Sequence, residues 1–367
     1  MGCGYTRHCA PSDAQGSEPS SGASPAAAGA SARDQQVVLI SPKALRLVGL
    51  LGTGHAGHVE LREDAGTGRT YALKVVSKGR IQKTGMVDAI RRERDILNLL
   101  ESPFIVKMFQ TYRCHQNLYF LMEVALGGHL HVAYNKHGFY GSPCHCQFYA
   151  AAASLALAHM HGRGVIHRQT TPENLLLDAY GRAKLINMDV AKLAEGRQTF
   201  TLCGTPDYFA PEMIGAQGHG SAVDWWSLGI LIFELMSGRL PFDASTPQQM
   251  LARIMKGIQS VPFPSECPAN VKDLIKALLR KNPNQRLPMR AGGMKNLMEH
   301  KWYQSFEWDA MIALTLEPPY RPKVCSNKDL GNFAAKQEKK PSVITFKDDG
   351  TGWDDDFGPV MSASVSI

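Results

Sequence analysis

The most informative segment of the sequence is Val165-Ile166-His167-Arg168-Gln169-Thr170-Thr171-Pro172-Glu173-Asn174, here called the loop motif. Two further motifs follow it, Lys184-Leu185-Ile186-Asn187-Met188-Asp189 and Cys203-Gly204-Thr205-Pro206-Asp207-Tyr208-Phe209-Ala210-Pro211-Glu212. In each motif, side chains that can bind a proton, a metal ion or a phosphate stand among apolar residues. Any one motif could arise by chance in a globular protein. Their order along one chain makes them informative.

A glycine-rich segment lies upstream of these motifs. It follows the apolar run 45–51 and reads Gly52-Thr53-Gly54-His55-Ala56-Gly57-His58-Val59. Glycines at this spacing let backbone amides close over phosphate groups. The segment alone is weak evidence, because glycine-rich hairpins are common. A dinucleotide-binding fingerprint is excluded, since a helix would have to follow the loop and a β-like run follows instead.

A lysine, Lys74, stands inside the apolar alternation Tyr71-Ala72-Leu73-Lys74-Val75. Burying an unpaired ammonium group is costly or shifts its pKa, so the lysine needs a partner. Glu93, on the polar side of the helical pattern over 88–100, is the candidate partner. The alternative is a lysine emerging from an edge strand and a solvated glutamate, which the pair alone does not exclude.

In motif order and spacing, the residues from about Leu45 to Trp302 resemble a eukaryotic protein-kinase domain. Three segments resemble the cyclic-nucleotide-dependent branch of the AGC kinases: Thr199-Phe200-Thr201-Leu202-Cys203-Gly204-Thr205-Pro206, Asp224-Trp225-Trp226-Ser227-Leu228-Gly229 and Asn282-Pro283-Asn284-Gln285-Arg286-Leu287. The segments His300-Lys301-Trp302-Tyr303 and Gly352-Trp353-Asp354-Asp355-Asp356-Phe357 look most like a cGMP-dependent protein kinase. The resemblance implies an α+β, bilobal protein-kinase fold, with a small β-rich N-lobe containing one main helix and a larger helical C-lobe.

The resemblance also implies a role for individual residues. ATP would be held by Leu51, Gly52, Gly54, Gly57, Val59, Ala72, Lys74, Met122, Glu123 and Ala125. Lys74 would orient the phosphates with Glu93 as its ion-pair partner, and Asn174 would be a Mg²⁺ ligand. The aromatic residue expected at the tip of the glycine loop is Ala56, and His129 replaces an expected acidic residue that would touch ribose or a basic substrate.

The catalytic positions depart from the family pattern. Gln169 stands where the family has an aspartate, and a neutral amide can orient a substrate hydroxyl but cannot accept its proton. Thr171 replaces the lysine that would neutralise the transferring phosphoryl group. Asn187 offers one neutral oxygen where Mg²⁺ prefers an anionic one. The sequence therefore predicts an ATP-binding pseudokinase with weakened or absent Mg²⁺ binding, acting as a signalling scaffold or regulator.

The alternative is an active serine/threonine kinase that transfers the ATP γ-phosphate with atypical residues, Asp189 supplying the metal carboxylate. The interval from Gln169 to Asn187 equals that between the two family aspartates, so no insertion or deletion moves Asp189 into register. A two-residue shift along a strand keeps the facing direction but displaces the carboxylate by about 6–7 Å. The two amides therefore favour the pseudokinase.

The resemblance extends to regulatory positions. Thr201 matches the activation-loop phosphorylation site, and Arg168 and Lys192 match two of the cations that would clamp a phosphate there. Phe200 and the segment near Thr205 leave open a cyclic-nucleotide-binding regulatory subunit as a partner, besides a protein substrate or another regulatory protein.

Further matches support the fold as much as a switch. Glu212 and Arg286 match the ion pair of the large lobe, and Asp224 matches the carboxylate that holds the catalytic loop. Three aromatic residues near the C-terminus would either dock on the small lobe, as the family's hydrophobic tail does, or belong to a disordered acidic end: Phe346, Trp353 and Phe357.

Composition excludes several classes of function. The 367 residues are 44% hydrophobic, enough for a sizeable core, and include no run of eighteen apolar residues, so no membrane span is predicted. The net charge of +7 is spread along the chain, which argues against nucleic acid as a partner. The eight cysteines include no Cys-x-x-Cys pair and no secretory signal precedes them, which predicts reduced thiols and a cytoplasmic location.

Four regions are expected: a flexible N-terminal tail over 1–36, an N-lobe over 37–125, a C-lobe over 126–303 and an AGC-type C-terminal tail over 304–367. The first region is too polar to offset its ordering entropy and too short for a cyclic-nucleotide-binding domain. It begins Met1-Gly2-Cys3-Gly4-Tyr5-Thr6, which fits N-myristoylation of Gly2, with Cys3 and Cys9 as palmitoylation candidates. Acylation would attach the protein to the cytoplasmic face of a membrane; the alternative is an ordinary start with inert cysteines.

Overall fold

The computed structural model describes residues 40–54, 57–194, 196–265, 267–334 and 344–361. The predictions made for the tail over 1–36, for Gly2, Cys3 and Cys9, and for Ala56 lie outside these residues.

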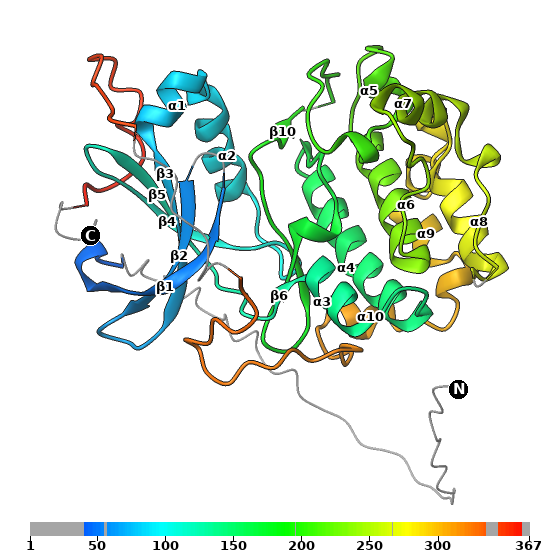
Figure 1. Cartoon of the computed structure of the whole chain (residues 1–367), viewed down its shortest axis with the longest axis horizontal. Coiled ribbons are helices and arrows are strands. Elements are labelled where there is room, and N and C mark those ends of the chain that lie inside the picture. The colour runs from blue at the N-terminus through cyan, green and yellow to red at the C-terminus, as the bar shows by residue number, and fades with distance from the viewer. Residues whose placement is uncertain (1–39, 55–56, 195, 266, 335–343, 362–367) are drawn as a thin grey trace, which may run out of the picture. The chain divides into compact units, whose positions relative to one another are not determined.

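The described residues of the small lobe form a five-stranded antiparallel sheet (Figure 1). Its order is β1 (Leu45–Thr53), β2 (Gly57–Asp64), β3 (Thr70–Ser77), β5 (Asn117–Met122) and β4 (Met108–Arg113). Both faces are covered, since Leu73 and Val75 of β3 join an apolar cluster on one side and Ala72 and Val76 join clusters on the other. Lys74 shares the second face, because side chains alternate along a strand.

Two helices connect β3 to β4. The main one, α2 (Val87–Leu99), has the bounds that the pattern over 88–100 predicts to within one residue. A short helix, α1 (Lys78–Thr84), precedes it and was not predicted, because its seven residues are too few to show an apolar period. The Ser77 hydroxyl accepts the Arg80 N–H at its start, and Gly85 ends it in the left-handed conformation.

The large lobe is mainly helical (Figure 1). Its longer helices are α3 (Leu130–His137), α4 (Pro143–His161), α6 (Ala222–Ser237), α7 (Pro247–Lys256) and α8 (Ala269–Leu278), with the shorter α5 (Pro211–Ile214), α9 (Met294–Met298) and α10 (Trp308–Ile312). Helices α4 and α6 are apolar around most of their circumference and form the centre of the core, where Ala153, Trp226 and Phe233 are fully buried. No helix in the described ranges is long and apolar enough to cross a bilayer.

Short strands and turns at the lobe junction carry the motifs. They are β6 (Gly128–His129), β7 (Val165–Ile166), β8 (Leu175–Leu177), β9 (Ala183–Leu185) and β10 (Lys192–Leu193). Strand β8 pairs with β6 and β9, and β7 pairs with β10. These pairings hold the loop motif beside the Asn187 segment. Strand β4 starts only at Met108, because the upstream Ile105 forms a bridge to Leu185 of the large lobe.

The segment 344–361 docks on the small lobe, which decides between the two alternatives for the C-terminal aromatic residues. Phe357 is fully buried, and the Arg94 guanidinium of α2 lies 4.6 Å from the centre of its ring. The flanking aspartates pair with the same lobe: Asp354 lies 2.6 Å from Lys78 and Asp356 lies 2.7 Å from Arg94. Apolar burial and charge pairing together fix this acidic segment against α2.

Candidate protein-kinase site

Lys74 on β3 and Glu93 on α2 form a close ion pair. The glutamate side chain is only 3% exposed, and the lysine side chain is 24% exposed. The Lys74 ammonium also lies 5.6 Å from the centre of the Phe120 ring. A buried carboxylate that holds the ammonium in one place leaves its remaining N–H groups free to donate to an anion.

The predicted ATP-facing residues form one apolar wall. Leu51 and Ala72 belong to a cluster packed against Val59 and Met122, and Phe333 of the C-terminal segment packs against the same cluster. Sequence reasoning missed Phe333, because it lies far beyond the motifs. Asn332, the residue before it, donates from its side chain to the carbonyls of Leu126 and Lys323. These bonds hold the segment on the hinge, the chain that follows β5.

The hinge after β5 carries an unused backbone donor. Ala125 is 3% exposed, and its N–H has no hydrogen-bond partner among the described residues. The Glu123 carbonyl likewise has no partner there, whereas the Glu123 side chain is 2.9 Å from the Lys184 ammonium. A buried donor without a partner is costly, so the hinge fits a ligand with a polar aromatic edge.

The glycines of the loop between β1 and β2 separate into two groups. Gly57 is required by the fold, because a Cβ there would lie 1.8 Å from the Val75 carbonyl oxygen. A Cβ on Gly52 would meet nothing within 4 Å, and one on Gly54 would only touch the Gly57 oxygen at 3.9 Å. Packing therefore does not require Gly52 or Gly54. Close approach of a ligand such as a phosphate group would.

A buried carboxylate supports the loop motif. Asp224 on α6 is fully buried and accepts the backbone N–H groups of His167 at 2.9 Å and Arg168 at 2.7 Å, while His161 Nε2 lies 2.7 Å from it. Burial alone would raise the pKa of Asp224, but the His161 hydrogen bond, the charges of His161 and His167 and the Arg168 N–H together lower it. The ionised carboxylate fixes the loop backbone, including Arg168 in its left-handed conformation at φ 67°.

Two amide side chains meet at the centre of the candidate site. Asn187 Nδ2 donates to Gln169 Oε1 at 3.2 Å, and Asn174 Nδ2 donates to the Gln169 backbone oxygen at 2.8 Å. Asn187 has φ 69°, a conformation that asparagine tolerates better than most residues. Two carboxylates at the positions of Gln169 and Asn187 would repel each other unless a cation lay between them. Two amides pair directly and need no cation.

Two neighbouring positions bear on whether a replacement charge lies near this pair. Thr171 is 2% exposed and uncharged. Asp189 and Asn187 do not lie on a strand, so the strand geometry assumed for the two-residue shift does not apply: β9 ends at Leu185, and the positive φ of Asn187 turns the chain. Asp189 Oδ1 is shielded from solvent without a hydrogen-bond partner, and its charge acts on His167 and Cys203.

An acidic groove of about 420 Å³ begins at Gln169 and Thr171. Its walls include the carboxyl groups of Glu173, Asp207 and Glu234. Burial raises the pKa of Glu234 to about 7, against the effect of the hydrogen bond that the Tyr208 hydroxyl donates to it. Sequence reasoning missed this groove, because Glu234 sits on α6 far from the loop motif and nothing in its local pattern marks it.

The segment around Thr201 lies against cationic side chains. The Thr201 side chain is exposed, and Arg168 Nη1 donates to the Thr201 carbonyl at 3.5 Å. Lys192 donates to the hydroxyl of Thr199 at 2.9 Å. Both cations predicted to clamp a phosphate therefore lie beside the segment, although neither contacts the Thr201 hydroxyl.

No group of three or more His, Cys, Asp and Glu side chains within the described ranges is arranged to hold a metal ion. Asn174 and Asn187, predicted at the metal position, lie on either side of Gln169 and use their amide groups to donate to it.

Comparison with known proteins agrees with this arrangement. The family model described as the protein kinase domain matches residues 45–303. The chain is 41% identical over 318 residues to cGMP-dependent protein kinase, isozyme 2 forms cD5/T2, of Drosophila melanogaster, covering 85% of this chain and 33% of that relative. It is 35% identical over 314 residues to human cGMP-dependent protein kinase 2, covering 85% of this chain and 41% of that protein.

The chain thus spans only 33% to 41% of the length of these two relatives. The match includes the sheet that carries Lys74, the loop motif and the ion pair of Glu212 with Arg286, at 2.6 Å. The chain belongs to the protein kinase family, with a catalytic domain like that of the AGC cGMP-dependent kinases.

Proposed function

We propose that this protein is a catalytically impaired pseudokinase that binds ATP and acts as a scaffold or regulator in signalling. The hydrogen bond between Gln169 and Asn187 carries the proposal. These two positions hold carboxylates in the family pattern, and here they hold neutral amides that satisfy each other. An amide cannot accept the proton of a substrate hydroxyl, and loss of proton acceptance alone typically costs about 10²–10⁴-fold in rate.

The same contact does not fit a resident Mg²⁺ ion. Magnesium requires near-octahedral oxygen ligands and usually binds through one or two carboxylates plus phosphate oxygens. Asn174 and Asn187 are neutral and turn N–H groups toward Gln169, so they add no negative charge to the position. Weakened or absent Mg²⁺ binding follows from this donor set.

Nucleotide binding is supported by parts of the site that do not need a metal. Lys74 would meet the phosphates, Gly52 and Gly54 leave room for them, and the Ala125 N–H and Glu123 carbonyl would meet the adenine edge. The ATP phosphates would accept hydrogen bonds from the Lys74 N–H groups that Glu93 does not use. These residues orient the nucleotide, and Phe333 helps to exclude water from its ring.

A thermal-shift titration tests nucleotide binding. ATP at 100 times its Kd should raise the free energy of unfolding by about 2.7 kcal/mol, and hence Tm by several degrees. The shift should be the same with Mg²⁺ and with EDTA, because the site lacks metal carboxylates. Lys74→Met should abolish it, with Lys43→Met, a lysine outside the site, as the control. A shift that requires Mg²⁺, or no shift at all, would contradict this part of the proposal.

The acidic groove supports binding of a basic protein segment, as a regulatory partner or a poorly turned-over substrate. Glu234 titrates near pH 7, so its ionised fraction rises from about one tenth at pH 6 to about nine tenths at pH 8. A carboxylate pairs with a guanidinium far better than a neutral carboxyl group does. An arginine-containing serine peptide should therefore bind up to about tenfold more tightly at pH 8 than at pH 6.

Fluorescence anisotropy with a labelled peptide measures this dependence. Glu234→Gln should flatten it, because no titrating carboxyl remains at that point of the groove. The matched control is Glu299→Gln, an exposed glutamate on the large lobe. A pH response that survives Glu234→Gln would place the titrating group elsewhere.

The second candidate, an active serine/threonine kinase with atypical residues, has one observation in its favour. The Asp189 Oδ1 atom lacks a partner and is therefore free to take a cation. Its charge acts on His167 and Cys203, whereas Gln169 and Asn187 occupy each other. Turnover with ATP and Mg²⁺ or Mn²⁺ that disappears in Asp189→Asn would support this candidate over the pseudokinase.

Three regulatory features remain proposals. Thr201 would be phosphorylated and held by Arg168 and Lys192. A cyclic-nucleotide-binding subunit would dock on Phe200, which is 67% exposed. We further propose a cytoplasmic location, in which acylation of Gly2 and Cys3 would attach the protein to the cytoplasmic face of a membrane.

A further inference from the structure

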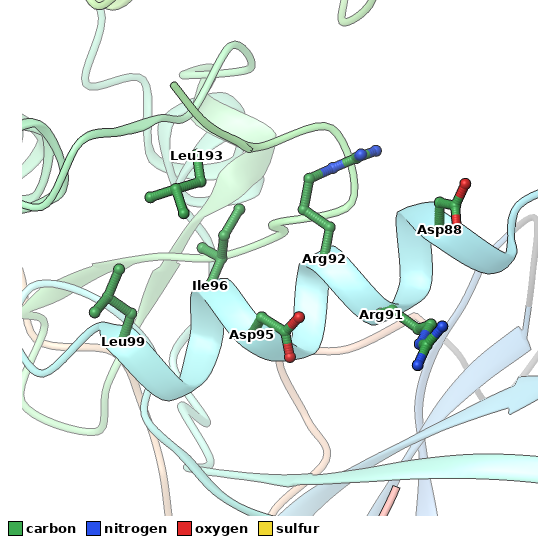
Figure 2. Close-up of a pocket in the computed structure, with 7 residues that line it drawn as sticks. All are labelled: Asp88, Arg91, Arg92, Asp95, Ile96, Leu99 and Leu193. Carbon is green, nitrogen blue, oxygen red and sulfur yellow. The ribbon is translucent and has the colours of Figure 1, made fainter. Parts of the chain in front are cut away.

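A pocket of about 340 Å³ opens between the small-lobe helix α2 and strand β10 of the large lobe (Figure 2). Helix α2 lines it with Asp88, Arg91, Arg92, Asp95, Ile96 and Leu99, and β10 supplies Leu193. Positions 88, 92, 96 and 99 fall on one face of a helix, because residues three and four apart are neighbours. The other face of α2 buries Glu93 and Leu97. Apart from Arg91, which pairs with Asp356, the pocket-lining residues form a second surface of the helix that is used neither by Glu93 nor by the docked C-terminal segment.

One end of this pocket is apolar. Leu99 is 44% exposed and Leu193 is 41% exposed, while Ile96 between them is 2% exposed. Figure 2 shows Leu193 approaching the helix face that carries Ile96 and Leu99. Single exposed leucines are ordinary, but two that face each other across a cavity form a site for an inserted side chain.

The charged side chains at this pocket are unequally paired. Arg91 lies 3.3 Å from Asp356, and Asp95 lies 2.7 Å from Arg94, so both are engaged. Arg92 forms no ion pair or hydrogen bond with any described residue, and its Nε atom is shielded from solvent without a partner. A guanidinium group whose N–H is shielded and unpaired gains from an added anion.

Other cations near Arg92 make its surroundings in the pocket positive. Burial lowers the pKa of Arg168, and the Arg92 charge acts in the same direction, so the two cations lie within electrostatic range. The charges of Arg168, Arg92 and Lys192 all act on the Cys203 thiol, against the charge of Asp189. Asp88 lies one helical turn beyond Arg92 and would repel a second acid there. Asp95, the other acid that lines the pocket, is paired with Arg94 at 2.7 Å, and Figure 2 shows the Arg92 side chain pointing away from the helix, where an anion can reach it.

The docked C-terminal segment shows how a similar surface of α2 is covered. On an adjacent face of α2, the docked segment places Asp356 against Arg94 and Arg91 and the Phe357 ring under the Arg94 guanidinium. On this helix, an arginine next to apolar side chains thus binds an acidic residue that is itself followed by an apolar residue. The pocket repeats the same combination and has no segment of the described chain on it.

We propose that this pocket docks a partner peptide, which inserts an aliphatic side chain between Leu99 and Leu193 and sets a carboxylate against Arg92. The occupant bridges α2, which carries Glu93, and β10, which continues toward Thr201. It therefore fixes the two lobes relative to each other at the Lys74–Glu93 pair. The site does not depend on whether the protein transfers phosphate.

Three labelled eight-residue peptides serve as probes in fluorescence anisotropy with the full chain: alternating leucine and aspartate, alternating alanine and aspartate, and alternating leucine and lysine. The first should bind at least about tenfold more tightly than the other two. Arg92→Glu and Leu193→Ser should each weaken it at least about tenfold, whereas Met255→Ser, an exposed apolar residue on α7, should leave it unchanged.

Two outcomes would overturn the proposal: equal binding of the acidic and basic leucine peptides, or binding that survives both pocket substitutions. Cooperative thermal unfolding of each variant, measured without ATP, reports that it is folded. This check does not use the nucleotide proposal, so failure of one proposal can be told from failure of the other. Methyl-labelled unmodified protein gives an independent measurement that no substitution can disturb. The leucine–aspartate peptide should shift the methyl resonances of Leu99 and Leu193, and unmoved resonances would contradict the docking site.

Discussion

The variant Gln169→Asp/Thr171→Lys/Asn187→Asp/Asp189→Gly is expected to phosphorylate a basic serine peptide at least about 10²–10⁴-fold faster than the unmodified protein. The first change supplies a proton acceptor, the second a cation for the transferring phosphoryl group, and the third a metal carboxylate. The fourth restores the residue type of the family pattern. The Lys74–Glu93 pair and the Asp224 support of the loop are already in place.

Radiolabel transfer from ATP measures this gain. The same four changes combined with Lys74→Met are the matched control and should return the rate to the starting value. A restored variant that is folded, binds ATP and stays inert would show that damage outside these four positions limits the chemistry. Single changes should recover much less, because residues that act together in catalysis are strongly non-additive.

Removing the Arg286 guanidinium should give the largest loss of stability. Arg286 is fully buried and makes a two-pronged ion pair with Glu212, at 2.6 and 2.7 Å, and also donates to the Ala222 carbonyl. Arg286→Ala leaves the Glu212 carboxylate buried without a partner, which typically costs about 3–5 kcal/mol. For a domain of this size, Tm should fall by about 10 °C.

Chemical denaturation followed by tryptophan fluorescence measures this loss. Arg280→Ala, an exposed arginine nearby, is the control and should change the free energy of unfolding by less than about 0.5 kcal/mol. The double variant Glu212→Met/Arg286→Met should cost less than the two single changes added together, since no charge is left unpaired. Equal effects of Arg286→Ala and Arg280→Ala would show that the pair does not stabilise the large lobe.

Much of the fold could be predicted from sequence, because its signals are local or come in a fixed order. Helix α2 shows an apolar period, and the strands of the small lobe alternate around Lys74. The partnership of Lys74 with Glu93 could be proposed because a lysine inside a strand pattern needs a carboxylate. The short helix α1 gave no such signal, since seven residues do not establish a period.

The contacts that decide function are less visible in sequence. Gln169 and Asn187 could each be identified as departures, but not as partners, because their contact depends on the left-handed turn at Asn187. Phe333 reaches the hinge only through the path of the C-terminal segment, and Glu234 reaches the groove only through the packing of α6. Such long-range placements have no local pattern.

The site residues that match the family pattern and those that depart from it differ in their physical role. Lys74, proposed to bind the nucleotide, pairs with Glu93, and Asp224, which holds the loop backbone, stays ionised. Groups that would move a proton or hold a metal have become neutral at Gln169 and Asn187. A domain altered in this way still presents its folded surfaces, including the acidic groove and the pocket beside α2, to other proteins.

The phosphotransfer rate of the unmodified protein decides whether it is a pseudokinase. The assay uses purified full chain, saturating ATP with Mg²⁺ or Mn²⁺, and an arginine-containing serine peptide, with Lys74→Met measured in parallel. The amide pair at Gln169 and Asn187 predicts a rate indistinguishable from that of Lys74→Met. Turnover near the roughly 1–100 per second usual for protein kinases, abolished by Lys74→Met, would contradict the account.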